Sequence, residues 1–193
     1  EHCMFICRTI IDLHVHLSHD EEDILLAAAL CHILPEHIRF RNLEEEMTKR
    51  FCLDREVYRI VKLLHQEENL SPSEIREYYD QIQKDKLAVL IMLTDRANQV
   101  ERLPELHNWE VHQYIYETKT YYFPMCIYAK EHYHELLSSV STMMDKIRTL
   151  TDVSEVLLVR YEAREAELIQ DILQLKEDNA TIKGIIEKLK REM

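Results

Sequence analysis

The chain has 193 residues, 46% of them hydrophobic, which is enough for one domain of ordinary size with an appended segment. Its formal net charge of −12 at pH 7 argues against nucleic-acid binding, because proteins that bind nucleic acids neutralise phosphates with Lys and Arg. One Gly and four Pro leave few helix breakers, so the composition argues against a β-sandwich or barrel and predicts an all-α fold.

The cysteines and the apolar runs indicate the cellular compartment of the protein. Five cysteines follow no disulfide spacing, and no uninterrupted apolar stretch is long enough to span a membrane. We therefore expect a cytoplasmic protein with no membrane partner. The chain begins with Glu1 rather than Met, which we interpret as an N-terminal truncation.

Helical spacing of apolar residues begins at the N-terminus. Residues 2–17 follow this pattern, and the nearly all-apolar run 21–34 predicts a buried central helix that Pro35 ends. Two shorter amphipathic helices are predicted at 42–51 and 54–66.

The second half of the chain continues in helices. The pattern from 73 to 103 predicts two of them, with a break near 84–86 and a stop at Pro104. Two further helical patterns cover 109–123 and 125–147, with a proline at their junction.

The final stretch, 152–193, has a heptad pattern. Its a and d positions form a narrow seam of residues that are alternately three and four apart. The seam residues are Leu158, Tyr161, Glu165, Leu168, Ile172, Leu175, Asn179, Ile182, Ile186, Leu189 and Met193. We expect two parts in the chain, a helical domain at 1–150 and a coiled-coil helix at 151–193.

Polar residues in and beside this seam indicate a partner helix. Asn179 falls at an a position, where a single buried Asn favours a parallel two-stranded coil. Asp171 lies at g, opposite Lys176 at e of the partner, and Asp178 and Lys183 repeat this pair one heptad later. The pattern predicts a homodimer through the C-terminal helix. The alternative is a long helix folded back onto its own domain.

Two short runs place potential metal ligands at the ends of apolar helical segments. The first run, 27–37, contains His32, and the second, 91–99, contains Asp95. Both resemble motifs of the histidine–aspartate (HD) phosphohydrolase superfamily, and within it of the RelA/SpoT-type domain that removes pyrophosphate from the alarmone (p)ppGpp. The resemblance implies an HD-domain-like helical bundle for 1–150.

The superfamily pattern H…HD…D implies a divalent metal site. His32 matches the middle histidine, and Asp95 matches the distal aspartate within a run similar to KLADRLHN. His2 matches the first histidine, because it precedes an apolar helix in a way similar to HPxxVA. The resemblance therefore implies that His2, His32 and Asp95 bind Mn or a similar divalent metal. The segment at 117–125 is also similar to the family's ETLEIYAPLA.

The catalytic pair of the family follows the second histidine as HDxxED, and the chain departs from this pattern. Glu36 is retained, but Ile33 replaces the metal-binding aspartate and His37 replaces the last acid. An Ile cannot ligate a metal, so we expect weak or absent metal binding and impaired hydrolysis. We take Glu36 and His37 as candidate catalytic residues, and Arg39, Arg41, Arg96 and Asn98 as candidate substrate-binding residues.

Three functions are compatible with these residues. The first is a catalytically impaired HD relative that acts as a dimeric regulatory or nucleotide-binding module for a guanine nucleotide. The second is an active metal-dependent (p)ppGpp or nucleotide pyrophosphohydrolase with an altered metal shell, in which Glu36 orients the attacking water. The third is a structural adaptor without a metal, in which His32 is a hydrogen-bonded core residue and Asp95 pairs with Arg96.

Overall fold

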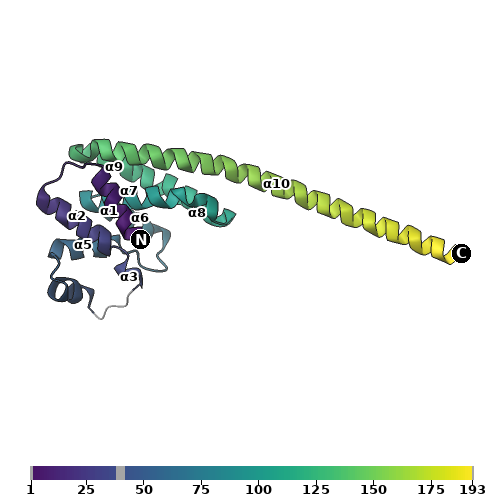
Figure 1. Ribbon diagram of the computed structural model, residues 1–193, viewed down its shortest axis with the longest axis horizontal. Coiled ribbons are helices and arrows are strands. Elements are labelled where there is room, and N and C mark those ends of the chain that lie inside the picture. The colour runs from purple at the N-terminus through teal and green to yellow at the C-terminus, as the bar shows by residue number, and fades with distance from the viewer. Residues whose placement is uncertain (1, 38–41, 193) are drawn as a thin grey trace. The chain divides into compact units, whose positions relative to one another are not determined.

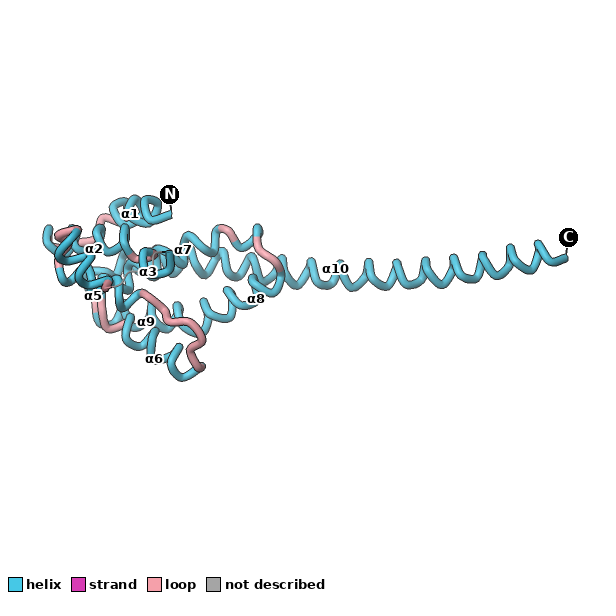
Figure 2. The backbone as a smooth tube through the Cα atoms, turned by 90° about the horizontal axis from the view of Figure 1, so that it is seen from below, coloured by secondary structure: helices cyan, strands magenta, loops and turns pink. Residues whose placement is uncertain are grey.

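The computed structural model describes residues 2–37 and 42–192, and all regular structure in these ranges is helical (Figures 1 and 2). This confirms the expected all-α fold with a long C-terminal helix. The chain divides into two compact units, Glu1–Asp152 and Val153–Met193, which we call unit 1 and unit 2. Among the described helices, none combines the length and the apolarity that a membrane crossing requires.

Four helices make the packed centre of unit 1 (Figure 1). They are α1 (His2–Asp12), α2 (His19–Cys31), α5 (Arg55–Leu64) and α7 (Lys86–Glu101). Helices α1 and α5 each contact both α2 and α7, and α2 also contacts α7. Ala28 of α2 is fully buried, and its small side chain allows the neighbouring helices to approach α2 closely.

The start of α7 is fixed by a capping carboxylate. Asp85 accepts hydrogen bonds from the backbone N–H groups of Leu87 (3.0 Å) and Ala88 (2.9 Å). Arg59 of α5 pairs with the same carboxylate and ties the start of α7 to α5. The predicted break near 84–86 is therefore confirmed, and its cause is this cap.

The remaining elements in the described part of unit 1 are helices and helical turns. They are α3 (Leu34–His37), α4 (Leu43–Glu45), the π-helical turn η1 (Glu46–Arg50), α6 (Pro72–Ile82), the 3₁₀ turn η2 (Leu103–Glu105), α8 (Asn108–Glu117), the π-helical turn η3 (Thr118–Tyr122), α9 (Phe123–His132) and the 3₁₀ turn η4 (His134–Leu136). The last helix, α10 (Leu137–Glu192), begins in unit 1, and the boundary between the units lies within it.

Two helix ends near the start of the chain differ from the predictions. Helix α1 ends at Asp12, because the chain turns at His14 with a left-handed φ of 47°. Helix α2 ends at Cys31, and Pro35 lies in the first turn of α3 instead. A proline needs no N–H partner in a first turn, so Pro35 helps to start a helix rather than to end one.

The predicted helix 125–147 is wrong, because the chain breaks between α9 and α10. Tyr133 follows the last residue of α9, and its hydroxyl donates a hydrogen bond to the backbone carbonyl of Gln83 (3.0 Å). Leu136 is fully buried directly before α10 begins at Leu137. These tertiary contacts break the helix without a breaker residue. The C-terminal helix consequently starts well before the predicted coiled-coil segment.

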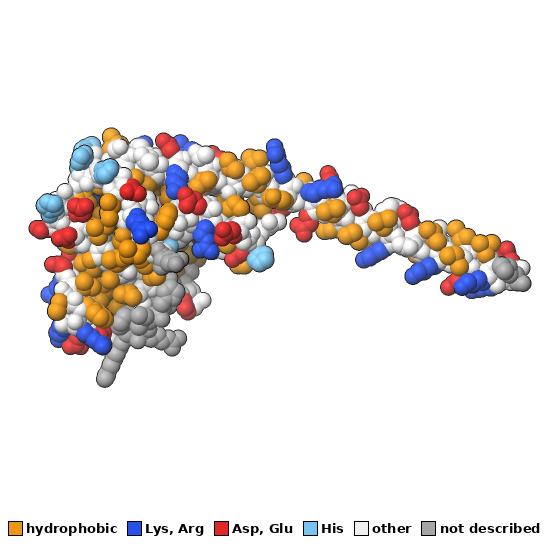
Figure 3. Space-filling view, in the orientation of Figure 1, with side chains coloured by type: hydrophobic (Ala, Val, Ile, Leu, Met, Phe, Trp, Pro, Cys, Tyr) orange, Lys and Arg blue, Asp and Glu red, His pale blue; other side chains and the backbone are white. Residues whose placement is uncertain are grey.

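Unit 2 is helical throughout its described residues and carries exposed apolar side chains (Figure 3). Charged side chains of both signs lie between them in this view. Seven of the exposed apolar residues belong to the predicted heptad seam: Tyr161, Leu168, Ile172, Leu175, Ile182, Ile186 and Leu189. Within one chain, unit 2 therefore leaves this part of its seam in contact with solvent.

Candidate metal centre

His32 lies directly after the last residue of α2, where helical carbonyls lack intrahelical partners. Its Nδ1 atom lies 2.7 Å from the carbonyl oxygen of Ala29. A carbonyl can only accept, so Nδ1 carries the proton and the neutral ring has its lone pair on Nε2. That Nε2 atom is buried and has no hydrogen-bond partner among the described residues. The ring is thus held in the tautomer that a metal ligand requires.

Asp95 lies on α7 with its two carboxylate oxygens in different surroundings. Its Oδ2 atom accepts a hydrogen bond from Nε2 of Gln99, one helical turn later (2.8 Å). Its Oδ1 atom lies 3.2 Å from Nε2 of His2, but it is buried and receives no well-directed hydrogen bond. A buried carboxylate oxygen with so little compensation is costly unless a cation or a donor reaches it.

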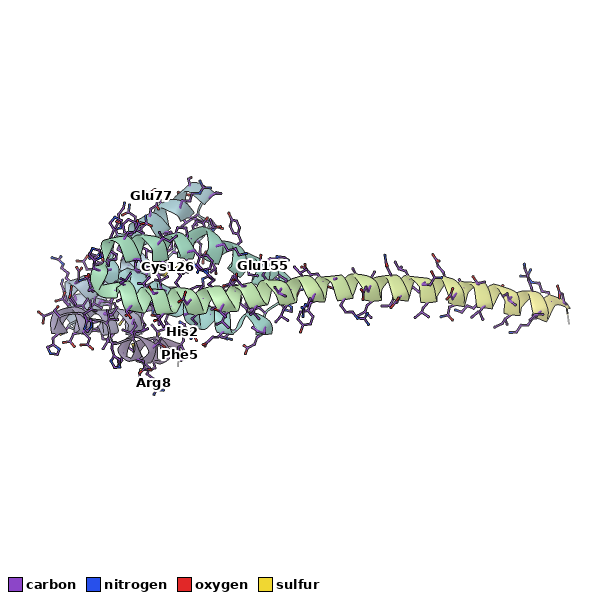
Figure 4. All side chains as sticks on the ribbon, turned by 90° about the horizontal axis from the view of Figure 1, so that it is seen from above. His2, Phe5, Arg8, Glu77, Cys126 and Glu155 are labelled. Atoms are coloured by element: carbon purple, nitrogen blue, oxygen red, sulfur yellow. The ribbon has the colours of Figure 1, made fainter. Side chains whose placement is uncertain are left out.

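His2 lies in the first turn of α1, where Figure 4 labels it. Its Nε2 atom faces Asp95, and its Nδ1 atom lies 3.1 Å from Nδ2 of Asn98. The contact with the Asp95 carboxylate raises the pKa of His2 above its ordinary value of 6.5, although partial burial opposes the increase. A metal ion that binds this imidazole must therefore displace a proton that is held more firmly than usual.

These three side chains converge from α1, the end of α2, and α7. One potential ligand atom of each lies within 4.8 Å of the others, and no other group of His, Cys, Asp or Glu in the described ranges meets this geometry. Metal–ligand bonds of about 2.0–2.2 Å place two ligand atoms at most about 4.4 Å apart, so a small inward movement would complete the fit. Two imidazoles and one carboxylate are suitable donors for a divalent transition metal.

The other residues predicted around the second histidine are placed as follows. Ile33 is half-buried in the turn between α2 and α3, and its hydrocarbon side chain adds no ligand. Glu36 and His37 belong to α3, but their side chains lie outside the described part of the structure. Arg39 and Arg41 lie outside the described residues.

Two neighbours on α7 orient the ligands. Asn98, predicted to bind substrate, contacts His2 in this structure, and Gln99 holds Asp95. A metal-bound His2 would carry its proton on Nδ1, and Asn98 can accept a hydrogen bond from this N–H when its amide presents oxygen. Sequence reasoning missed Gln99, although its position four residues after Asp95 on a helix is a signal for such a contact.

Arg96 is nearly fully buried, with 1% of its side chain exposed. Its Nη2 atom donates a hydrogen bond to Glu117 (2.8 Å), and its guanidinium lies over the rings of Tyr122 (4.1 Å) and Tyr114 (4.8 Å). The structural ion pair of Arg96 is therefore with Glu117 and not with Asp95. Its Nε and Nη1 atoms are buried and have no hydrogen-bond partner in the part of the chain that the structure describes.

A cavity of about 200 Å³ adjoins two of the three candidate ligands, His32 and Asp95. Its wall contains His32, Asp95 and Arg96 together with Leu64, Gln66, Tyr78, Tyr79, Met92, Gln99, Tyr114, Glu117 and Tyr122. Small-molecule pockets usually exceed about 300 Å³, so this cavity fits one group of a ligand, such as a phosphate, rather than a whole nucleotide. A larger open depression of about 840 Å³ lies over α4 and η1, and none of the three candidate ligands lines it.

Comparison with known proteins adds no assignment. No family model matches the chain, and no curated protein matches it. The HD resemblance therefore stays a prediction that rests on the short motifs themselves.

Proposed function

We propose that unit 1 binds one divalent transition-metal ion through His2, His32 and Asp95 and uses it to hold the phosphate groups of a guanine nucleotide. We propose further that hydrolysis is impaired, so that unit 1 acts as a binding or regulatory module. Side-chain geometry supports the metal part of this proposal. The resemblance of 27–37 and 91–99 to the RelA/SpoT-type domain supports the nucleotide part.

The observation that carries the proposal is the buried Nε2 atom of His32. Buried polar atoms without partners are uncommon in folded proteins and require an explanation. Here the hydrogen bond from Nδ1 to Ala29 leaves a lone pair on Nε2, and Oδ1 of Asp95 is also buried without a hydrogen bond. A divalent ion would satisfy both atoms at once. A bound water that donates to both is the alternative, and metal analysis distinguishes the two.

The charges at this centre favour an anionic ligand once an ion is bound. Two neutral imidazoles and one carboxylate leave a divalent ion with a net charge of about +1. The centre would thus attract phosphate although the whole chain has a net charge of −12. The adjoining cavity has room for a phosphate, and Arg96, which has free donors, is part of its wall. A bound ion would polarise the phosphate and acidify a bound water.

Ile33 is the reason to expect impaired hydrolysis. It stands where the superfamily has a metal-binding aspartate, so one bond and one negative charge are missing from the shell. With fewer ligands an ion is bound more weakly and is positioned less firmly. A water bound to such an ion would be less well oriented for attack on a phosphate.

Metal analysis of the full chain tests the metal part. In equilibrium dialysis against excess Mn, the wild type should bind about one Mn per chain, as one three-ligand centre requires. Asp95→Asn should bind little. Asp145→Asn is the matched control, because Asp145 is an exposed carboxylate of α10, and it should bind like the wild type. Equal Mn in both variants would contradict the proposal.

Thermal denaturation tests the nucleotide part. A ligand that binds only the folded state raises Tm by mass action. We expect guanosine 3′,5′-bis-diphosphate to raise Tm in Mn-loaded protein, and to do so far less in metal-free protein or in Asp95→Asn. A metal-loaded chain with no shift would favour the structural adaptor.

A second candidate, an active metal-dependent nucleotide pyrophosphohydrolase, is favoured by one observation. Three protein ligands leave coordination positions open, as catalytic metal sites do. Release of pyrophosphate from (p)ppGpp by Mn-loaded wild type, lost in Asp95→Asn, would support it. If neither the wild type nor Ile33→Asp released pyrophosphate, this candidate would be rejected.

The partner of the chain belongs to the same proposal. We propose that the chain forms a homodimer through unit 2, because the apolar seam of its helix is exposed in the single chain. Light scattering of the full chain should give twice the mass of one chain, and a single-chain mass would contradict the homodimer.

A further inference from the structure

The seam of unit 2 also contains information about how two chains pair. We infer that residues 168–192 form a parallel, in-register, two-stranded coiled coil with a second copy of this chain. The inference rests on the homodimer of the proposed function, adds the direction and register of its helices, and is independent of the metal centre.

The apolar side chains of the seam are exposed in the single chain and so are available to a partner helix. Six apolar a and d side chains between 168 and 189 have exposed fractions from 45% to 61%, and α10 is uninterrupted across them. They repeat over about three heptads, which is the length at which a coiled-coil pattern becomes meaningful. The flanks of this seam are mostly charged, with Ile169 at e and Ile185 at g as the exceptions, and such a narrow seam fits a second helix rather than a broad surface.

The residue types at a and d favour two parallel helices. Ile172 and Ile186 are β-branched residues at a. Three of the four d positions in this part of the seam hold leucine: Leu168, Leu175 and Leu189. Ile at a with Leu at d packs best in a parallel dimer, whereas Ile at both positions shifts the preference to three or four chains. Ile182, the fourth d residue, is the exception.

Asn179 sets the register. It occupies the a position between Ile172 and Ile186, so a parallel in-register pair places the two Asn179 amides opposite each other, where they can hydrogen-bond. A shifted or antiparallel pair would bury each amide against an apolar side chain, which costs free energy. One polar residue therefore disfavours the alternative pairings.

The charges beside the seam agree with this direction. In a parallel pair Asp171 at g faces Lys176 at e of the second chain, and Asp178 faces Lys183 in the same way. Within the described part of one chain, none of these four residues has an ion-pair partner. Asp178 does accept a hydrogen bond from Gln174 (3.0 Å). Their charges are thus available to a second chain.

An antiparallel pair would bring like charges together. In that arrangement e positions face e positions and g positions face g positions. Three of the four e positions (176, 183 and 190) are Lys, and two of the g positions (171 and 178) are Asp. Like charges along both flanks would oppose the antiparallel pair.

Sedimentation equilibrium of the full chain tests the number of helices with two matched variants. Ile182 at d and Leu173 at b are equally exposed in the single chain, at 54% each. The wild type and Leu173→Asp should have the mass of two chains. Ile182→Asp should raise the dimer Kd by roughly 100-fold or more, because it buries a carboxylate in the seam. A wild type of one, three or four chains, or equal behaviour of the two variants, would overturn the inference.

Disulfide trapping tests the direction. In a background with Cys52→Ser, which removes the exposed cysteine, Leu189→Cys places a thiol at d near the end of the helix. Molecular oxygen with a copper catalyst should oxidise the two thiols to a disulfide across a parallel pair. Lys188→Cys, one residue away and outside the seam, should stay largely uncross-linked. A dimer that Leu189→Cys fails to cross-link is not parallel and in register.

Discussion

His32 shows a conflict between stability and binding at a single residue. Its buried Nε2 atom has no hydrogen-bond partner, and leaving such an atom unsatisfied costs about 1–3 kcal/mol in the metal-free chain. The same atom is the ligand that the proposed centre needs. Functional sites commonly retain residues that a purely structural core would replace.

The carboxylate of Asp95 should control the protonation of His2. The contact with this carboxylate is the largest cause that raises the pKa of His2, and partial burial acts in the opposite direction. Asp95→Asn keeps the shape and removes the charge, so the pKa of His2 should fall to its ordinary value or below. NMR titration of the His2 ring in metal-free protein measures this. Asp145→Asn should leave the pKa of His2 as in the wild type.

The raised pKa of His2 also predicts opposite pH dependences with and without metal. Because its folded-state pKa lies above the unfolded value of 6.5, His2 stabilises the metal-free chain fully below that value, and this contribution is lost as pH rises through the folded pKa. Mn binding needs the neutral ring, so Mn affinity should rise over the same pH window. As pH rises through this window, the Tm of the metal-free chain should lose the contribution of His2, whereas the increase in Tm caused by Mn should become larger. Parallel curves of Tm against pH, with and without Mn, would count against His2 as a ligand.

The cap of α7 is the point at element scale where stability and site geometry meet. Asp85 accepts two backbone hydrogen bonds and pairs with Arg59, so Asp85→Ala should destabilise the chain by about 1–2 kcal/mol. Urea denaturation measures this loss, and Asp145→Ala should change the free energy of unfolding by less than about 0.5 kcal/mol. The folded variant should still bind Mn, because Asp95 lies more than two turns further along α7.

Element boundaries were predictable where a local signal sets them. The break before α7 follows from Asp85, a cap with a sequence signature. The break between α9 and α10 depends on the contact of Tyr133 with Gln83 and on the burial of Leu136, which no local pattern encodes. The prediction that Pro35 ends the second helix is wrong. Proline occurs both after helix ends and in first turns, and only the observed end of α2 shows that Pro35 belongs to the first turn of α3.

The candidate site was predictable to a similar degree. The sequence motifs named His2, His32 and Asp95, and the packing of α1 against α2 and α7 brings them together. The motifs do not predict which tautomer His32 adopts, because the tautomer depends on a contact with the backbone carbonyl of Ala29. The sequence predicts a substrate-binding role for Asn98 and not its contact with His2, because the two residues are far apart in the sequence and only the fold brings them together.

At the scale of the whole molecule, the proposed assembly should make unfolding depend on chain concentration. Dissociation accompanies unfolding of a dimer, so Tm should rise with concentration. Asn179→Ile should raise Tm further, because an Asn at a lowers coil stability in exchange for specificity, and it should allow assemblies of more than two chains. Circular dichroism melts and light scattering measure both effects. A lower Tm for Asn179→Ile would show that this residue is not buried in a seam.

The place of His2 in α1 has one more consequence. A first turn has N–H groups without intrahelical partners and opens more readily than the middle of a helix. A metal ion bound to His2 would restrain this turn, so the fraction of chains with bound metal would control how often the backbone opens there. Deuterium uptake by the amides that hydrogen-bond to the carbonyls of this turn, from Ile6 onward, should therefore slow when Mn is added, and this measurement needs no nucleotide and no turnover.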